Sequence, residues 1–83
     1  MNAMSARTEL KLDPRWIINK GIMTRDGYPH SSIVGTTEDS IIVVEGVVRT
    51  HKYVIPKSLI TNFDGSYLHL SITESELSKY EEK

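Results

Sequence analysis

The chain of 83 residues contains no cysteine. Disulfide bonds and cysteine-ligated zinc sites are therefore excluded, and with them the small secreted folds that depend on such cross-links. No apolar run approaches the roughly 20 residues needed to span a bilayer. Residues 1–12 also lack the apolar segment of a signal peptide. We therefore expect a cytoplasmic protein with no membrane insertion.

Strong net charge and recognisable catalytic motifs are absent as well. The formal net charge is −1, so no global attraction to nucleic acid or anionic lipid is expected. There is no glycine-rich phosphate loop, no nucleophile elbow around Ser58 and no pair of carboxylates facing across a cleft. Glu74 and Glu76 lie on different sides of a helix start, where the helix dipole accounts for both. The sequence therefore predicts a protein that is not an enzyme and has no cofactor.

What the chain does contain is a series of short strand patterns separated by turns. Residues 1–12 show no sustained period and are predicted to be a flexible tail, which leaves residues 13–83 as a single domain. Asp13 and Pro14 have the form of a one-turn helix start, and Trp16 is expected to cover an open end of the core. The first strand is expected at residues 20–24, with Ile22 inward. Further strands are predicted at residues 31–37, 41–44, 47–54, 60–63 and 67–72.

The stretch from Tyr53 to Ile72 organises the rest of the chain. Pro56 cannot donate to a strand ladder, so the strand before it must stop there. Residues 57–59 are expected to form a single helical turn at a barrel corner. Apolar and polar residues then alternate from 67 to 72, with Leu68, Leu70 and Ile72 on the buried face.

Asp64-Gly65 predicts a hairpin turn before the last strand. A two-residue loop would pair Ile60 with His69. A three-residue loop with Gly65 as a bulge would pair Ile60 with Leu68 and keep Ile60 on the core face. Because a one-residue slip moves every side chain to the other face, the bulged loop is favoured.

Residues 41–44 are apolar on both faces of their expected strand. One face belongs to the core, and the other must be covered by Trp16, by the C-terminal helix or by a second subunit. This predicts a homodimer in which residues 41–44 or the edge at residues 49–54 meet a symmetry mate. The C-terminal helix itself is marked by a capping sequence beginning at Thr73 or Ser75.

Four segments together resemble the PRC-barrel superfamily, in its short stand-alone bacterial and archaeal form. They are Gly21-Ile-Met-Thr-Arg-Asp-Gly27, the apolar strand 40–45, the corner Val54-Ile-Pro-Lys-Ser-Leu-Ile60 and Asp64-Gly-Ser-Tyr-Leu-His-Leu70. Thr73, Glu76 and Leu77 fit the closing element. The resemblance covers residues 20–80, and its motifs are mostly residues that make the fold. Pro29-His30-Ser31-Ser32 departs from the family pattern, so the shape of the first loop is open.

The resemblance implies an all-β fold, a small six-stranded SH3-like barrel with a short C-terminal helix. Members resemble adaptors: the cytoplasmic domain of the photosynthetic reaction centre H subunit, the C-terminal domain of the ribosome maturation factor family and the N-terminal domain of an archaeal cell-division protein. No shared catalytic residues carry over. The expected function is therefore that of a non-enzymatic interaction module for protein partners, including a second copy of itself.

A local basic cluster supplies the alternative function. Cations position phosphates and aromatic rings stack on bases, so an RNA- or ribosome-binding surface is the second hypothesis. The competing interpretation is an edge strand whose charges prevent aggregation. The candidate binding surface comprises Arg49, His51, Lys52, Tyr53, Lys57, Tyr67 and His69.

The three histidines are the remaining candidates for metal ligands. His30, His51 and His69 sit on separate predicted elements with no short ligand spacing and no supporting carboxylate pattern, whereas histidine ligands normally come in clusters with supporting partners. A separate surface position is therefore expected for each.

Overall fold

The computed structural model describes residues 13–82, so the predicted flexible tail at residues 1–12 lies outside the described residues. Short strands dominate the described chain, and the helical elements are single turns. In chain order the elements are α2 (Pro14–Ile17), β1 (Gly21–Met23), β2 (Pro29–Ser31), β3 (Ile33–Thr36), β4 (Ser40–Glu45), β5 (His51–Pro56), the 3₁₀ turn η1 (Lys57–Leu59), β6 (Ile60–Phe63), β7 (Tyr67–Leu70), α3 (Glu74–Leu77), the 3₁₀ turn η2 (Ser78–Tyr80) and β8 (Glu81–Glu82).

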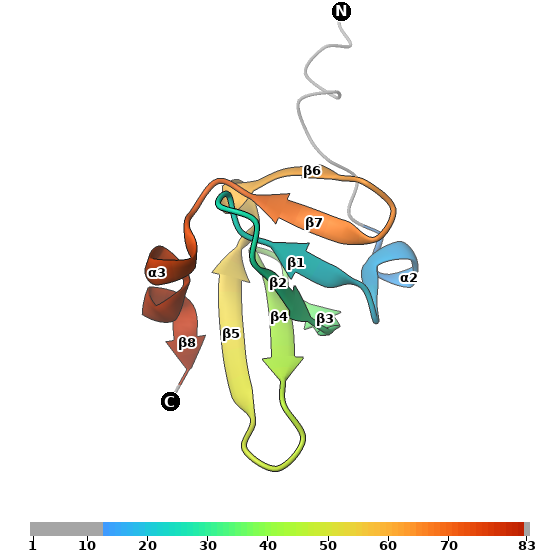
Figure 1. Ribbon diagram of the computed structural model, residues 1–83. Helices are drawn as coiled ribbons and strands as arrows, with labels where there is room; N and C mark the ends of the chain where they lie inside the picture. Colours follow the sequence, from blue (N-terminus) through green and yellow to red (C-terminus); the bar gives the residue numbers. More distant parts are fainter. Residues whose placement is uncertain (1–12, 83) are drawn as a thin grey trace, which may run out of the picture.

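The strands form two four-stranded sheets, in the orders β2-β1-β7-β6 and β3-β4-β5-β8. The predicted all-β class with a short C-terminal helix is therefore confirmed at this level, and the strand pairings of the described residues close neither sheet. Among these pairs only β1 and β7 run parallel. The chain crosses from the first sheet to the second at Ser32 and returns through η1 (Figure 1).

The corner at Pro56 forms as predicted. β5 ends at this proline, η1 makes one 3₁₀ turn over residues 57–59, and β6 leaves in the other sheet. The backbone N–H of Lys57 donates to the carbonyl of Asp39 at 2.8 Å, which ties the corner to the turn before β4. Pro56 therefore ends the strand because it has no N–H to donate, and the backbone bond of Lys57 stabilises the corner.

The core lies between the two sheets. Ile22 and Leu68 of the first sheet and Ile41, Val43 and Ile55 of the second are each 0% exposed. β4 alternates as a strand with one fully buried face, and Ile42 and Val44 on its other face are half-buried. The inward placement of the β1 isoleucine and of the alternating face of β7 is confirmed.

The predicted register of the β6–β7 hairpin is wrong, although its buried face is right. Phe63 pairs with Leu68 and Ile60 pairs with Leu70, and the ladder is interrupted between Ile60 and Asn62. The irregularity thus lies inside β6 and not at Gly65, which has a φ of +100° in the turn. The extra residue in β6 restores the alternation of inward and outward side chains. Ile60 therefore still lies in the core, at 9% exposure.

Three further expectations need correction. Trp16 is 58% exposed and does not cover the core, because α2 turns Ile17 inward at 1% exposure instead. Residues 47–50 are a loop, so the strand predicted over 47–54 begins only at His51. The single strand predicted over 31–37 is divided into β2 and β3, with a register shift beside Gly35 that agrees with the predicted bulge.

No helix within residues 13–82 has the length and apolar character to cross a membrane.

Candidate functional site

His30 is the centre of the most connected polar cluster among the described residues. It lies in β2 opposite Ile22 of β1, and directly opposed residues of an antiparallel pair share one face of the sheet. Since Ile22 points to the core, the imidazole is carried inward too, and its side chain is only 10% exposed. Its ring meets the Tyr53 ring edge-on, with centroids 5.8 Å apart. The expected surface position of His30 is therefore wrong.

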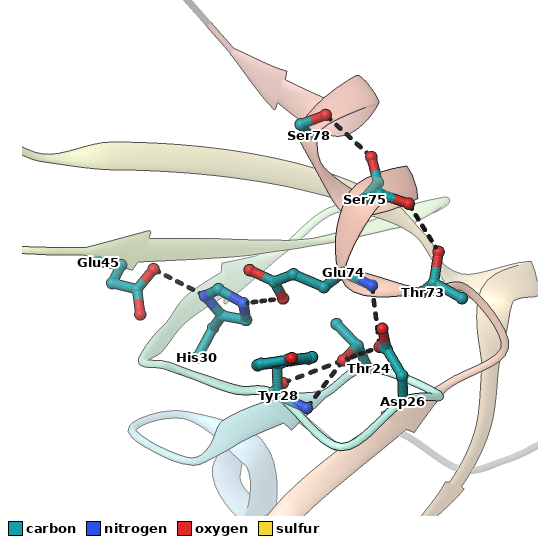
Figure 2. A network of polar contacts seen from close by, with 9 residues as sticks. All are labelled: Thr24, Asp26, Tyr28, His30, Glu45, Thr73, Glu74, Ser75 and Ser78. Atoms are coloured by element: carbon teal, nitrogen blue, oxygen red, sulfur yellow. Dashed lines mark hydrogen bonds and ion pairs between the residues drawn. The ribbon is translucent and has the colours of Figure 1, made fainter.

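A carboxylate contacts each nitrogen of the His30 ring (Figure 2). Nδ1 lies 2.8 Å from Glu45 Oε1 at the end of β4, and Nε2 lies 2.7 Å from Glu74 Oε1 in the first turn of α3. An ionised carboxylate only accepts hydrogen bonds, so both nitrogens must donate, which only the imidazolium form can do. The geometry therefore fits a protonated histidine between two negative groups.

The electrostatics agree with this assignment. Burial alone would lower the pKa of His30, but hydrogen bonds and charges from Glu74 and Glu45 more than offset it, so the pKa is raised above its ordinary 6.5. Burial, followed by the charges of Glu81, Glu45 and Glu74, raises the pKa of Tyr53 above 10.0. The charged groups around the imidazole are thus predominantly negative.

The turn between β1 and β2 extends the cluster toward α3. The hydroxyl of buried Thr24 donates to Asp26 Oδ1 at 2.7 Å and accepts from the Tyr28 N–H at 2.9 Å. The same Asp26 oxygen accepts from the Glu74 N–H at 2.9 Å, and Figure 2 shows this connection beside the histidine. The hydrogen bond from Thr24 is the main reason that the pKa of Asp26 is lowered. Glu74 is therefore fixed by its backbone as well as by its side chain.

The first turn of α3 is held by a capping box. The Thr73 N–H donates to Glu76 Oε1 at 2.8 Å, and the Thr73 hydroxyl donates to the same oxygen at 3.1 Å. The Thr73 and Ser75 hydroxyls lie 3.2 Å apart, and the Ser78 hydroxyl donates to the Ser75 carbonyl at 3.1 Å (Figure 2). Of the two predicted caps, Thr73 and Ser75, the structure has Thr73 at the N-cap. The interpretation of Glu74 as a merely solvated acid is wrong, because it reaches His30.

The structure separates the residues of the predicted binding surface. Arg49 is exposed in the β4–β5 loop, whereas Lys57 is half-buried in η1 beyond the other end of β5. A strand of six residues spans roughly 20 Å. Tyr53 is 8% exposed and faces the core, so it cannot offer its ring to a ligand as the prediction required.

Two of the four residues of the predicted basic cluster already have an acidic partner. His51 Nδ1 lies 2.6 Å from Glu81 Oε2, and Lys52 Nζ lies 2.9 Å from Glu82 Oε1, across the β5–β8 pair. Sequence reasoning missed these contacts because β8 carries no strand pattern beyond two residues.

Tyr67 and His69 lie in the other sheet, in β7. His69 Nε2 lies 2.6 Å from Asp64 Oδ2, and that contact, with backbone donors, lowers the pKa of Asp64 to about 2. All three histidines therefore have a carboxylate partner that no pattern in the sequence had indicated. Within the part of the chain that the structure describes, no group of three or more His, Cys, Asp or Glu side chains is placed to hold a metal ion.

The most exposed apolar residues lie at the tip of the β4–β5 hairpin. Val47 and Val48 are 95% and 99% exposed. Gly46 precedes them with a φ of +100°. Figure 1 shows this hairpin loop projecting beyond the two sheets. Comparison of the chain with protein-family models, with curated proteins and with solved structures found no match.

Proposed function

We propose that this chain is a non-enzymatic interaction module that binds a protein partner through the tip of the β4–β5 hairpin. The observation that carries the proposal is the nearly complete exposure of Val47 and Val48, next to each other in the sequence. A fully buried valine contributes about 1.5 kcal/mol or more relative to an exposed one. Covering both with a partner would therefore contribute substantially to binding.

The paired strands β4 and β5 carry the tip as a projecting loop. β4 and β5 pair without interruption from Ser40 opposite Pro56 to Glu45 opposite His51. Gly46 then begins a tight turn, where an added Cβ would lie 2.3 Å from the Arg49 carbonyl oxygen. A protruding element that is already ordered loses little conformational entropy on binding. The partner that fits such a tip has an apolar recess.

We further propose a PRC-type, six-stranded SH3-like barrel as the family architecture. The 3₁₀ corner after Pro56, the positive φ of Gly65 and the capping box at Thr73 support it. In this assignment β1, β3, β4, β5, β6 and β7 are the barrel strands, and β2 and β8 are additions. A cytoplasmic location and the absence of a cofactor belong to the same proposal.

The contacts of His30 support a non-enzymatic function. A general acid or base needs a ring nitrogen within reach of the substrate, yet both nitrogens of this ring are occupied by carboxylates. The imidazole therefore acts as a cross-link between elements.

RNA or ribosome association through Arg49, His51, Lys52 and Lys57 is the alternative function. The contacts of His51 and Lys52 with Glu81 and Glu82 weigh against it, since the paired acids reduce the local positive potential. The exposed Arg49 next to the valine tip is compatible with either partner.

The experiment compares capture of partners from the native cell by the tagged full chain and by a Val47→Ser/Val48→Ser variant. Val34→Ser is the matched control, because Val34 is a half-exposed valine on β3, away from the tip. We expect the double variant to fold normally and to lose the protein that wild type and Val34→Ser retain, with or without nuclease. Equal capture by the double variant would overturn the proposal. Loss on nuclease treatment, with a steep dependence on salt, would favour the RNA alternative.

A further inference from the structure

The last described part of the chain, residues 73–82, lies along β5 as a separate segment (Figure 1). We call it the C-terminal segment. It adds β8 to the β5 edge, with Tyr53 opposite Glu81 and Lys52 opposite Glu82. Leu77 anchors it in the core at 1% exposure. The segment therefore covers a strand edge that would otherwise present unpaired backbone groups.

Three acids of the C-terminal segment contact bases on other elements. Glu74 reaches His30 in β2 at 2.7 Å. Glu81 and Glu82 reach His51 and Lys52 in β5 at 2.6 and 2.9 Å. Of the three basic partners, His30 is the most buried, with a side chain that is 10% exposed. Attachment of the segment thus depends on charge as well as on apolar packing.

The contact with Glu74 depends on the proton count of His30. A neutral imidazole carries one N–H, so it can donate to one carboxylate only, and its unprotonated nitrogen then faces the other carboxylate oxygen. Glu45 ends a six-residue strand that is paired to β5. Glu74 begins a four-residue helix. Glu74 belongs to the shorter of the two elements, so we expect deprotonation to act on the C-terminal segment, against the hold of the Asp26 bond and of Leu77.

The charged and titratable groups around His30 come from every element packed on it. Glu45 faces it from β4, Glu74 from α3 and the Tyr53 ring from β5. Asp26 of the β1–β2 turn adds a further acid through its bond to the Glu74 N–H. These surroundings are acidic, so they favour the protonated ring.

We propose that the C-terminal segment is a pH-sensitive latch, closed on β5 while His30 is protonated between Glu45 and Glu74 and opened locally when that proton is lost. Opening uncovers the β5 backbone at residues 52 and 53. Because the pKa of His30 is raised in the folded protein, the latch is closed at low pH and opens as the pH rises. The stabilisation is complete below the ordinary value of 6.5 and is lost as the pH rises through the higher value of the folded state. This inference does not depend on the proposed protein partner.

Amide hydrogen exchange of the full chain, followed by NMR from pH 5.5 to 8.5 and corrected for the intrinsic pH dependence of exchange, tests the latch. We expect protection of the amides of residues 76–82 to fall about threefold to tenfold as the His30 ring deprotonates. The amides of Ile22 and Leu68 in the core report global unfolding and should keep their protection. His30→Gln, which cannot be charged, should show the low protection at every pH.

His69→Gln is the matched control, since it removes a histidine paired with a carboxylate outside the C-terminal segment, and it should leave the pH step unchanged. Should His30→Gln fail to fold, Glu74→Gln replaces it. This variant removes one negative partner, so the titration of His30 should move to lower pH. Protection of residues 76–82 that is the same at both ends of the pH range in wild type, or a pH step that persists in either variant unaltered, would overturn the proposal.

Discussion

Gly46 and Gly65 have the same φ of +100°, but their surroundings differ. A Cβ added at Gly46 would lie 2.3 Å from the Arg49 carbonyl oxygen, whereas a Cβ at Gly65 would meet nothing within 4 Å. A non-glycine residue would therefore have a strained backbone at either site. It would also clash with its surroundings at Gly46 only.

This difference predicts the ranking of two alanine variants. Gly65→Ala should cost about 1–2 kcal/mol of unfolding free energy from strain alone. Gly46→Ala should cost at least about 1 kcal/mol more, because the β4–β5 turn must also open. Urea denaturation of both variants measures the difference. Equal losses would show that the turn at residue 46 relaxes without cost.

His30 shows what the sequence could have revealed at the scale of one residue. Its inward position follows once β1 and β2 are paired around Asp26-Gly27, because Ile22 is then directly opposite. The strand pattern in the sequence begins only at residue 31, which places the histidine in the preceding loop. Its two carboxylate partners come from β4 and α3, and no local pattern in the sequence predicts such long-range contacts.

At the scale of elements, β7 carries the clearest link between pattern and burial. Leu70 is 3% exposed, pairs with Ile60 and packs in the core between the sheets. Leu70→Ala should destabilise the protein by about 2–5 kcal/mol, because a cavity is added to the lost transfer free energy. Ser71→Ala, at an exposed neighbouring position, is the control and should stay within about 0.5 kcal/mol of wild type. Thermal unfolding that is the same for both variants would contradict the assigned core face.

Local chemistry made the Pro56 corner, the cap at Thr73 and the helix start at Asp13 predictable. Each depends on one or two residues with a strong backbone preference, and the Asp13 carboxylate accepts from the Arg15 N–H at 2.9 Å as an N-cap should. The β6–β7 register could not be predicted, because the irregularity inside β6 has no glycine or proline to mark it. β8 was missed because it forms only by adding to β5. The candidate site was therefore less predictable than the elements that surround it.

For the whole molecule, the titrating groups predict a stability maximum in mild acid. His30 has a raised pKa, so its stabilisation is lost as the pH rises above 6.5 through the folded-state value. Asp64 has a pKa lowered from 3.8 to about 2, so its contribution is present above 3.8 and lost as the pH falls through about 2. Lowered pKa values of Asp26 and Glu76 act in the same direction as Asp64.

Denaturant unfolding at a series of pH values measures this profile. His30→Gln should flatten the alkaline limb and leave the acidic limb in place, whereas Asp64→Asn should weaken the acidic limb only. A wild-type stability that rises steadily from pH 6 to pH 9 would contradict the charged state assigned to His30.

Self-association stays a prediction, but the structure narrows the surface that could support it. β4 lies between β3 and β5 in its sheet, so residues 41–44 are not at an edge. β8 already pairs with β5 at residues 52 and 53, so that part of the predicted edge is occupied as well. The half-buried outer face of β4, with Ile42 and Val44, is what a second copy could cover. Sedimentation across a wide concentration range should show dimers, and Val44→Lys should shift the chain to monomers. A monomeric wild type at high micromolar concentration would contradict this expectation.

The parallel pairing of β1 with β7 has a consequence for how the chain is made. Residues 21–23 pair with residues 67–69, so β1 must wait for about 45 further residues before its partner exists. Synthesis proceeds at roughly 5–20 residues per second, and the β4–β5 hairpin is complete during that interval. Ile22, at the centre of β1, can pair with His30 of β2 early but lacks its β7 neighbour for several seconds of synthesis. We expect β1 to be the strand on which the ribosome-bound chain is most exposed to chaperones and proteases.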